Sequence, residues 1–264
     1  MRTRSPAVAG LFYPADPGAL GAEVARHLAA ARPTDRPPPK ALIAPHAGYV
    51  YSGPIAGSAY AAWAPLRGTV ERVVLLGPAH RVPVRGLAAP TVDAFDGPLG
   101  PVRIDRAALD AVADLPQVVF ADRPHAQEHA LEVQIPFLQA VLGDFALAPF
   151  VVGDARDAEV AEVLDRLWGG DETRIVISSD LSHYHDYATA AARDRRTVDA
   201  IVRQDPAALD FDAACGRVPI RGLLALGQRR GLRVEAIDVR SSGDTAGDRD
   251  RVVGYAAFTV EERA

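Results

Sequence analysis

The chain has 264 residues, of which 48% are hydrophobic, and 34 acidic against 29 basic side chains give it a formal net charge of −5. This composition suffices for a full hydrophobic core, and the acidic balance argues against a nucleic-acid partner, which would reward a basic face. The single cysteine excludes an internal disulfide and a Cys₄ metal site. No segment has the apolar length of a signal peptide or a membrane span, so we expect a cytoplasmic protein with no membrane partner.

The first predicted element is a helix near the N-terminus. Asp16 can cap it, and Pro17 suits its first turn. Apolar side chains follow at helical spacing: Leu20, Val24 and Leu28. The proline-rich residues 33–39 come after this helix, and we interpret them as a surface connection to the next strand.

Short apolar runs, bounded by turn residues, then alternate with helical patterns. The predicted strands are Ala41–Ala44, Val73–Leu76, Phe145–Val152, Ile175–Ile177 and Val234–Val239. The predicted helices are Glu128–Leu142 (interrupted at Pro136), Asp157–Leu167, Tyr187–Arg203 and Pro219–Arg230. Strands that are apolar throughout are typical of sheets covered on both faces. The alternation predicts one α/β domain over residues 1–264, with a central, largely parallel or mixed sheet flanked by helices.

Four of the predicted strands end in Gly, Pro or Ser turns that carry a His or an Asp. These turns are Pro45–Tyr49, Gly77–His80, Ser178–His183 and Arg240–Asp244. In open α/β sheets, ligands bind in the crevice beyond the carboxyl ends of the strands. We therefore expect the four turns to meet at one polar pocket.

The residues of these turns predict a metal site. Two imidazoles and a carboxylate are the ligand set of non-haem Fe(II) oxygenases, and His46, His80 and Asp244 provide it. The same set suits catalytic zinc, so the ligands alone do not choose the metal. His183 is then a candidate catalytic acid–base group, with Asp180 as the carboxylate that orients it. For Asp180, a helix cap is an equally good interpretation.

Seven motifs carry a resemblance to a known family. They are Ala9–Pro14 (AGLFYP), Ala44–Tyr49 (APHAGY), Gly77–His80 (GPAH), Glu128–Gln134 (EHALEVQ), Ser178–Tyr184 (SSDLSHY), Cys215–Ile220 (CGRVPI) and Ser241–Asp244 (SSGD). In this order the sequence resembles the Memo family over nearly its whole length, from about Pro6 to Phe258.

The resemblance implies a fold like that of the LigB-type class III extradiol dioxygenases, which open catechol rings with Fe(II). It implies that His46 and His80 are metal ligands and that the third ligand position falls on Asp244, where some family members carry Cys. A cysteine there would favour softer metals such as copper, whereas Asp restores the oxygenase-like triad. We therefore expect a divalent metal, Fe(II) first, with zinc or copper as alternatives. Relatives described as component B of the AmmeMemoRadiSam system suggest radical-SAM system proteins as partners.

Other motif residues are expected to form the pocket wall. The predicted substrate-binding set is Tyr13, Tyr49, His129, Glu132 and Cys215. His27 is expected to face solvent from its amphipathic helix. His125–His129 matches the inverted zincin pattern H-x-x-E-H, but the helix is only starting after Pro124, and we reject a protease on this ground.

Three hypotheses follow for function. The first is a Memo-family metalloprotein with an iron dioxygenase-like pocket that acts on a small-molecule ligand such as an aromatic diol. The second is a non-catalytic component that uses the same pocket to bind a peptide or a partner protein. The third is a zinc-dependent hydrolase. Pocket residues look alike in the first two, so the sequence does not separate them.

Overall fold

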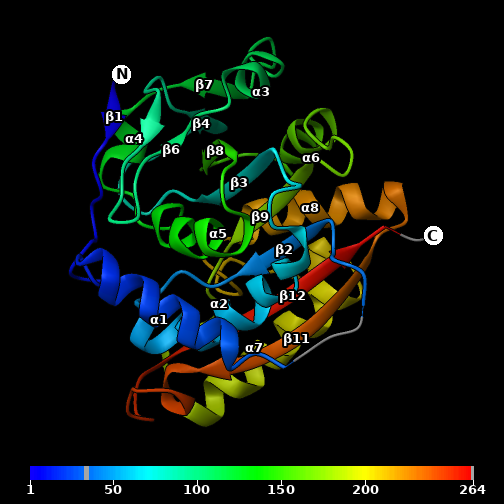
Figure 1. The fold of residues 1–264 in the computed structure, drawn as a ribbon. Coiled ribbons are helices and arrows are strands. Elements are labelled where there is room, and N and C mark those ends of the chain that lie inside the picture. Colours follow the sequence, from blue (N-terminus) through cyan, green and yellow to red (C-terminus); the bar gives the residue numbers. More distant parts are fainter. Residues whose placement is uncertain (33–35, 263–264) are drawn as a thin grey trace.

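A nine-stranded mixed sheet crosses the molecule in the computed structural model, which describes residues 1–32 and 36–262 (Figure 1). Its strands are β2 (Ala41–Ala44), β3 (Arg72–Pro78), β4 (Leu87–Ala89), β7 (Val118–Phe120), β8 (Ala146–Val152), β9 (Thr173–Ser178), β10 (His183–His185), β11 (Arg233–Ser241) and β12 (Val252–Glu261). The strand order is β10–β12–β2–β9–β3–β8–β4–β7, and β11 also pairs with β12. A separate small sheet joins β1 (Thr3–Arg4), β5 (Ala94–Phe95) and β6 (Val102–Arg103).

The centre of the large sheet consists of four parallel strands, β2, β9, β3 and β8. Apart from half-buried Arg72 at the start of β3, their residues are buried, which explains their continuous apolar runs. The four strands predicted here are confirmed, and so is the α/β fold class with its mixed sheet.

The fifth predicted strand, Val234–Val239, is present but is not a buried parallel strand. It belongs to β11, which runs antiparallel to β12 and has only Val234 and Ser241 buried, while its other residues are half-buried or exposed. Strand β12, which the sequence analysis missed, lies between β11 and β2 and pairs antiparallel with both. The mixed character of the sheet therefore comes from the C-terminal hairpin of β11 and β12.

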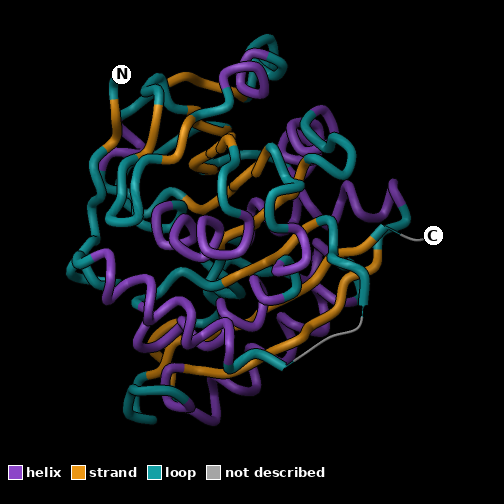
Figure 2. Tube along the Cα trace, viewed as in Figure 1, coloured by secondary structure: helices purple, strands orange, loops and turns teal. Residues whose placement is uncertain are grey.

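Helices cover both faces of the sheet. They are α1 (Pro17–Ala29), α2 (Tyr49–Ala61), α3 (Arg106–Asp110), α4 (Arg123–Ala126), α5 (Ile135–Leu142), α6 (Asp157–Arg166), α7 (Tyr187–Val202) and α8 (Arg217–Arg230). On one face α2 packs on β2, β11 and β12, and α1 and α5 pack on α2. On the other face α7 packs on β11 and β12, and α8 packs on β3 and carries α6 (Figures 1 and 2).

Most predicted helices are confirmed. The Asp16 side chain accepts a hydrogen bond from the amide of Ala19 (2.8 Å) and so caps α1. Helices α6, α7 and α8 match their predicted ranges to within two residues. The predicted Glu128–Leu142 helix is shorter, because a turn and the 3-10 helix η2 (Glu132–Gln134) precede α5. Helix α2 was missed, since Pro54 lies inside it and glycine and serine interrupt its pattern.

His27 corrects one expectation about α1. Its side chain is buried rather than solvent-facing, and it packs on α2 where Gly53 and Gly57 leave room for it. A Cβ added at Gly53 would lie 2.4 Å from His27 Nε2. The pattern of α1 alone does not reveal this contact, because the small residues that permit it belong to another helix.

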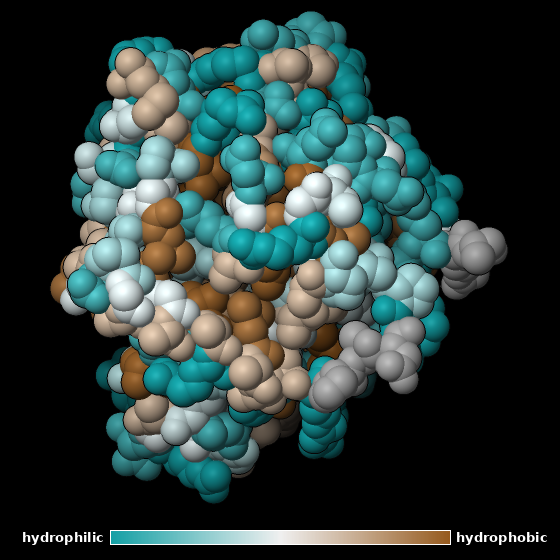
Figure 3. All heavy atoms as spheres, in the orientation of Figure 1, coloured by the Kyte–Doolittle hydropathy of each residue, from teal (hydrophilic) through white to brown (hydrophobic). Residues whose placement is uncertain are grey.

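The buried apolar side chains form one hydrophobic core that extends from Val8, before α1, to Val260 of β12. A single core of this kind is the mark of one domain among the described residues. Of the proline-rich connection, residues 33–35 lie outside the described part, and Pro39 accepts a hydrogen bond from Trp63 Nε1 (2.8 Å). Figure 3 shows hydrophilic residues over most of one face, with hydrophobic residues emerging mainly along its middle. No helix in the described ranges has the length and apolar character needed to cross a membrane.

Candidate metal centre

Two histidines meet at the carboxyl edge of the parallel strands. His46 lies two residues after β2 and His80 lies two residues after β3. Strand β9 runs between these two strands, and the carboxyl ends of parallel neighbours meet at the same edge of a sheet. The two imidazole rings cross edge to face, with centroids 5.2 Å apart. Of the four turns that the sequence singled out, those after β2 and β3 therefore meet here.

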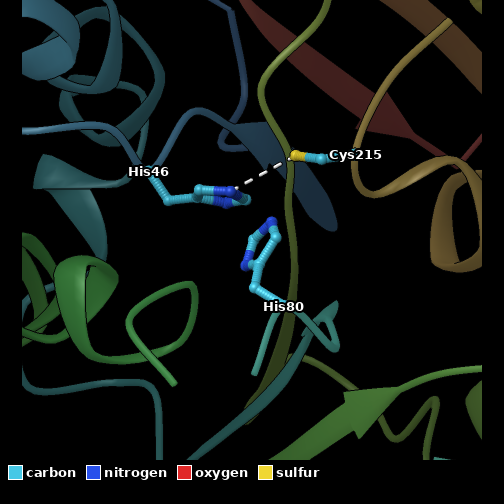
Figure 4. Close-up of side chains that lie close together, drawn as sticks. All are labelled: His46, His80 and Cys215. Atoms are coloured by element: carbon cyan, nitrogen blue, oxygen red, sulfur yellow. Dashed lines mark hydrogen bonds between the residues drawn. The ribbon is translucent and has the colours of Figure 1, made fainter. Parts of the chain in front are cut away.

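Cys215 completes this cluster. Its Sγ lies 3.3 Å from His46 Nε2, and one ligand atom from each of His46, His80 and Cys215 lies within 4.8 Å of the others (Figure 4). The loop that carries Cys215 approaches the end of β9 closely because the next residue is Gly216. A Cβ at Gly216 would lie only 2.6 Å from the Cβ of Ser179. From the sequence Cys215 is expected in the pocket wall, and the structure places its Sγ in a group of atoms that could hold a metal ion.

Asp244, the third ligand expected from the sequence, is not in this cluster. It lies in the 3-10 helix η4 (Ser242–Asp244), where its carboxylate accepts hydrogen bonds from Tyr187 Oη (2.7 Å) and from the amide of Ser241 (2.8 Å). Burial opposes ionisation, but these hydrogen bonds hold the pKa of the Asp244 carboxyl below its usual range.

The sheet order explains this correction. Strand β11 leads into η4, and β12 lies between β11 and β2. Two strand spacings therefore separate the end of β11 from the end of β2, roughly 10 Å at about 4.8 Å each. Asp244 lies at the same edge of the sheet as His46, but it is too far along that edge to join His46, His80 and Cys215. Among the described residues, the groups of ligand-type side chains near His46 and His80 do not include Asp244.

His80 is held in place by a buried carboxylate. Its Nδ1 lies 2.9 Å from Glu128 Oε1, and its backbone amide donates to Glu128 Oε2 (2.7 Å). Burial would raise the pKa of Glu128, but the hydrogen bond from His80 and those from nearby amides outweigh it and lower the pKa to about 2. The carboxylate is thus ionised and accepts a hydrogen bond from Nδ1 of His80, which leaves the electron pair of Nε2 free to bind a metal. Carboxylates behind imidazoles in this way are typical of metal sites.

His129 lies beside His46 and His80. Its ring stacks on that of His80, with centroids 4.7 Å apart, and lies 5.4 Å from that of His46. Burial, followed by the charge of His46, lowers the pKa of His129 to about 4. His80, Glu128 and His129 form a second group of ligand-type atoms within 4.8 Å of one another. Of the predicted substrate-binding residues, His129 and Cys215 therefore belong to the groups of ligand-type side chains.

The other three predicted substrate-binding residues brace the site from behind. Tyr13 is buried and donates from its hydroxyl to Glu132 Oε1 (2.6 Å), while buried Tyr49 donates to the carbonyl of Val133 (2.7 Å). The other donors to the Glu132 carboxylate are Arg4 and the amides of Ala7 and Val8. This corrects the expectation of a substrate contact, because the polar atoms of Tyr13, Tyr49 and Glu132 are occupied within the protein.

Asp180 and His183 lie in the turn after β9 and at the start of β10. Asp180 is buried and accepts a hydrogen bond from the amide of His46 (2.8 Å), while its own amide donates to Cys215 Sγ (3.2 Å). It therefore ties the His46 turn to the Cys215 loop and does not cap a helix. Half-buried His183 is close enough to influence the charge of both His46 and Asp180.

The H-x-x-E-H pattern does not form a zincin site. Helix α4 ends at Ala126, so His125 and His129 do not share a helix face. His125 is buried, and its Nε2 is 2.9 Å from the carbonyl oxygen of Ala88. Glu128, the would-be catalytic base, holds His80 instead.

Comparison with known proteins places this arrangement in a family. The model of the Memo-like protein family matches residues 4–259. The chain belongs to the Memo family. It is 36% identical to a MEMO1 family protein of Aquifex aeolicus and 37% identical to one of Methanopyrus kandleri, in each case over 97% of this chain and 98% of the relative. These matches confirm the resemblance carried by the seven motifs.

A solved structure supports the fold of this Memo-family chain. The uncharacterized protein JW3007 from Escherichia coli K12 superposes with a TM-score of 0.53 and 13% sequence identity. The match covers 83% of this chain and 98% of that chain. At this identity the similarity extends to the fold alone.

The donor set of this Memo-family site fits a transition metal. Burial, followed by the charge of His80, holds the pKa of His46 well below its usual range, so its imidazole is neutral as a ligand must be. Burial raises the pKa of the Cys215 thiol, so a metal would have to displace its proton on binding. The amide of Asp180 already points at the sulfur and would stabilise the thiolate.

Proposed function

We propose that this Memo-family chain is a metalloprotein whose metal is held by His46, His80 and Cys215. The observation that carries the proposal is the convergence of their three ligand atoms within 4.8 Å at the carboxyl edge of the sheet. Both histidines are also held from behind by hydrogen bonds, as metal-binding imidazoles ordinarily are.

The thiolate bears on the choice of metal. Cys is a softer ligand than Asp, so His46, His80 and Cys215 suit copper or zinc better than the expected set with Asp244. Iron is still compatible with imidazole ligands, and we keep Fe(II) as a proposed occupant beside these two metals. A bound redox metal would supply electron transfer and oxygen activation, and three protein ligands would leave positions open for a substrate.

The proposed activity is a metal-dependent oxidoreductase reaction, of the dioxygenase type if the metal is Fe(II). In this proposal His183 moves a proton to or from the substrate, because it is half-buried beside the cluster and its charge acts on both His46 and Asp180. Asp180 positions the turn that bears it. The substrate would be a small molecule with oxygen ligands, such as an aromatic diol.

Metal content tests the ligand assignment. We would purify the wild type, Cys215→Ser and Asp244→Asn without oxygen, load each with Fe(II), Cu(I) or Zn(II) separately, and count bound metal per chain. The expected result is close to one metal per chain in the wild type and in Asp244→Asn, and a loss of at least tenfold in affinity in Cys215→Ser. Circular dichroism of all three confirms that the fold is intact.

The opposite results are equally informative. Metal retained by Cys215→Ser but lost by Asp244→Asn would return the third ligand to Asp244. A wild type that binds none of the three metals would remove the metalloprotein proposal. The same chain would then be better explained as a non-catalytic component that binds a peptide or a radical-SAM partner in this pocket.

A further inference from the structure

A chain of buried polar side chains begins at Nδ1 of His46, the ring nitrogen that does not face Cys215. This Nδ1 lies 2.8 Å from Ser178 Oγ, and Gln134 Nε2 lies 2.8 Å from the same Oγ. Gln134 Oε1 in turn lies 2.8 Å from the hydroxyl of Tyr60. His46, Ser178, Gln134 and Tyr60 are all 0% exposed, so no solvent completes their hydrogen bonds.

The direction of these hydrogen bonds can be worked out from fixed donors and acceptors. The amide of Gln134 must present Nε2 to the backbone carbonyl of Pro45 (3.0 Å), since a carbonyl only accepts. The same Nε2 therefore donates to Ser178 Oγ. Tyr60, at the other end of the amide, donates to Oε1.

Ser178 then has no proton left for His46. Its hydroxyl carries a single proton, and the carbonyl oxygen of Ala130, 2.6 Å away, can only accept it. The contact between Ser178 Oγ and His46 Nδ1 must therefore be a hydrogen bond donated by Nδ1. With the proton on Nδ1, the neutral imidazole has its free electron pair on Nε2, the nitrogen 3.3 Å from Cys215 Sγ.

We propose that Ser178 is a positioning residue of the metal centre, which holds His46 in the tautomer with a free Nε2. Gln134 and Tyr60 keep the Ser178 hydroxyl turned toward Ala130 and thereby enforce this role. The inference rests on the proposed function, because a free Nε2 beside Cys215 matters only if the two bind a metal. The position of Ser178 suits the task, since it is the last residue of β9, between the strands that lead to His46 and His80.

The two ligand histidines are thus held by different chemistry. Glu128 accepts from His80 with a full negative charge, whereas Ser178 accepts from His46 with a neutral hydroxyl. A carboxylate makes its imidazole a stronger electron donor than a hydroxyl does. His46 is therefore oriented by a neutral hydroxyl, with no negative charge at Nδ1. This suits a ligand whose Nε2 faces Cys215, because the sulfur would carry a negative charge once it binds a metal.

The tautomer can be measured without any metal. We would label the histidines of the metal-free protein with ¹⁵N and record the long-range ¹H–¹⁵N correlations that distinguish the two neutral tautomers. A His46→Asn variant assigns the His46 signals among the seven histidines of the chain. The wild type is expected to show His46 protonated at Nδ1, and Ser178→Ala is expected to show a mixture or the other tautomer.

Metal affinity is the second readout. Co(II) serves as the probe, because its charge-transfer absorption reports bonding to a cysteine thiolate. Ser178→Ala is expected to bind Co(II) about 10–100-fold more weakly than the wild type, the ordinary cost of losing such a supporting contact. Ser178→Thr keeps the hydroxyl and is expected to restore both the tautomer and the affinity. Ser52→Ala is the matched control, since it removes another fully buried hydroxyl, one that donates to Ala47.

The results separate this inference from the proposed function. His46 protonated at Nε2 in the wild type would overturn the role of Ser178, as would an unchanged tautomer and Co(II) affinity in Ser178→Ala. The wild-type spectrum decides the tautomer even if Ser178→Ala does not fold. The wild type could instead show His46 protonated at Nδ1 and bind no Co(II). That result would refute the proposed metal site and the positioning role of Ser178 in it, while the assigned tautomer of His46 would stand.

Discussion

At the scale of single residues, the environment of a side chain decides its role more than its type does. Asp244 and Glu128 are both carboxylates near the same edge of the sheet. Asp244 is bound to Tyr187 and Ser241, whereas Glu128 is buried behind His80. Only Glu128 contacts a histidine of the cluster formed by His46, His80 and Cys215, and it was not singled out as a supporting group from the sequence.

The first prediction concerns Glu128. Glu128→Gln removes the negative charge of the carboxylate that accepts the hydrogen bond from His80 Nδ1, but it preserves the shape of the side chain. We expect Zn(II) affinity to fall about 10–100-fold, as is usual when such a supporting partner is lost. Isothermal titration with Zn(II) measures this, and Glu159→Gln, at the surface start of α6, is the control. Equal affinities in the two variants would show that Glu128 is not needed to hold His80.

The second prediction separates His183 from its neighbour. His183 and His185 both belong to β10, and His183 is the one whose charge acts on His46 and Asp180. His183→Gln is expected to lower turnover about 10²–10⁴-fold, the range for losing an acid–base group, without changing metal content. His185→Gln should leave turnover nearly unchanged. Oxygen consumption by the Fe(II)-loaded protein with a panel of catechols measures both, and similar rates in the two variants would remove His183 from the mechanism.

At the scale of elements, α1 packs closely on α2 at Gly57, whereas another helical glycine, Gly21, has no such neighbour. Gly57 of α2 lies against the backbone of His27, so a Cβ there would be 2.5 Å from the His27 carbonyl oxygen. Gly21 of α1 is also inside a helix, but a Cβ there would meet nothing within 4 Å. The two positions look alike in sequence and differ only in what packs on them.

The third prediction uses this pair of glycines. Gly57→Ala is expected to lower the free energy of unfolding by about 1–3 kcal/mol, because the helices must move apart. Gly21→Ala is expected to raise it by roughly 0.5–1 kcal/mol, because alanine is the better helix residue. Urea denaturation monitored by circular dichroism measures both. A neutral Gly57→Ala would mean that α1 and α2 are packed less closely than the structure shows.

The fourth prediction concerns pH and the same contact. Burial, partly offset by Glu23 and reinforced by Arg26, lowers the pKa of His27 below its usual value of about 6.5, and its ring otherwise faces Tyr49 and Phe137. Below about pH 6.5 the unfolded chain then binds more protons than the folded chain. The contribution of the neutral, buried His27 to the free energy of unfolding is therefore complete above that pH and is lost as the pH falls.

His27→Leu is therefore expected to lose less stability than the wild type between about pH 7.5 and pH 5. Urea denaturation at both pH values gives the two differences, and comparing them cancels the contributions of the other histidines. If the two proteins lose the same amount of stability, His27 is not held neutral by the fold.

At the scale of the whole molecule, the N-terminal strand β1 is bound to the segment that holds His80. Arg4 of β1 is buried and pairs with Glu132, and it also donates to the carbonyls of His125 (2.8 Å) and Glu128 (2.6 Å). Glu128 is the residue that holds His80. The contact of Arg4 in β1 with Glu128 thus helps to hold His80 in place, although β1 itself contributes no side chain to the cluster of His46, His80 and Cys215.

The fifth prediction tests the ion pair between Arg4 and Glu132. Arg4→Met leaves the Glu132 carboxylate buried without its cation, which is expected to cost about 3–5 kcal/mol of unfolding free energy. Arg156→Met breaks an ion pair at the surface and should change stability little. Thermal and urea unfolding compare the two variants. Similar small losses would mean that Arg4 does not anchor the N-terminal strand.

The sequence by itself determined the family, the α/β class and the central strands, because these depend on local patterns: motifs, apolar runs and the turn residues that end them. It also singled out His46 and His80, since each directly follows a buried strand. The place of Cys215, rather than Asp244, beside the two histidines and the contacts of Glu128 and Ser178 with them were decided only by the tertiary structure. They depend on β12 lying between β11 and β2, on the loop before α8 approaching β9 at Gly216, and on hydrogen bonds between segments that are far apart along the chain.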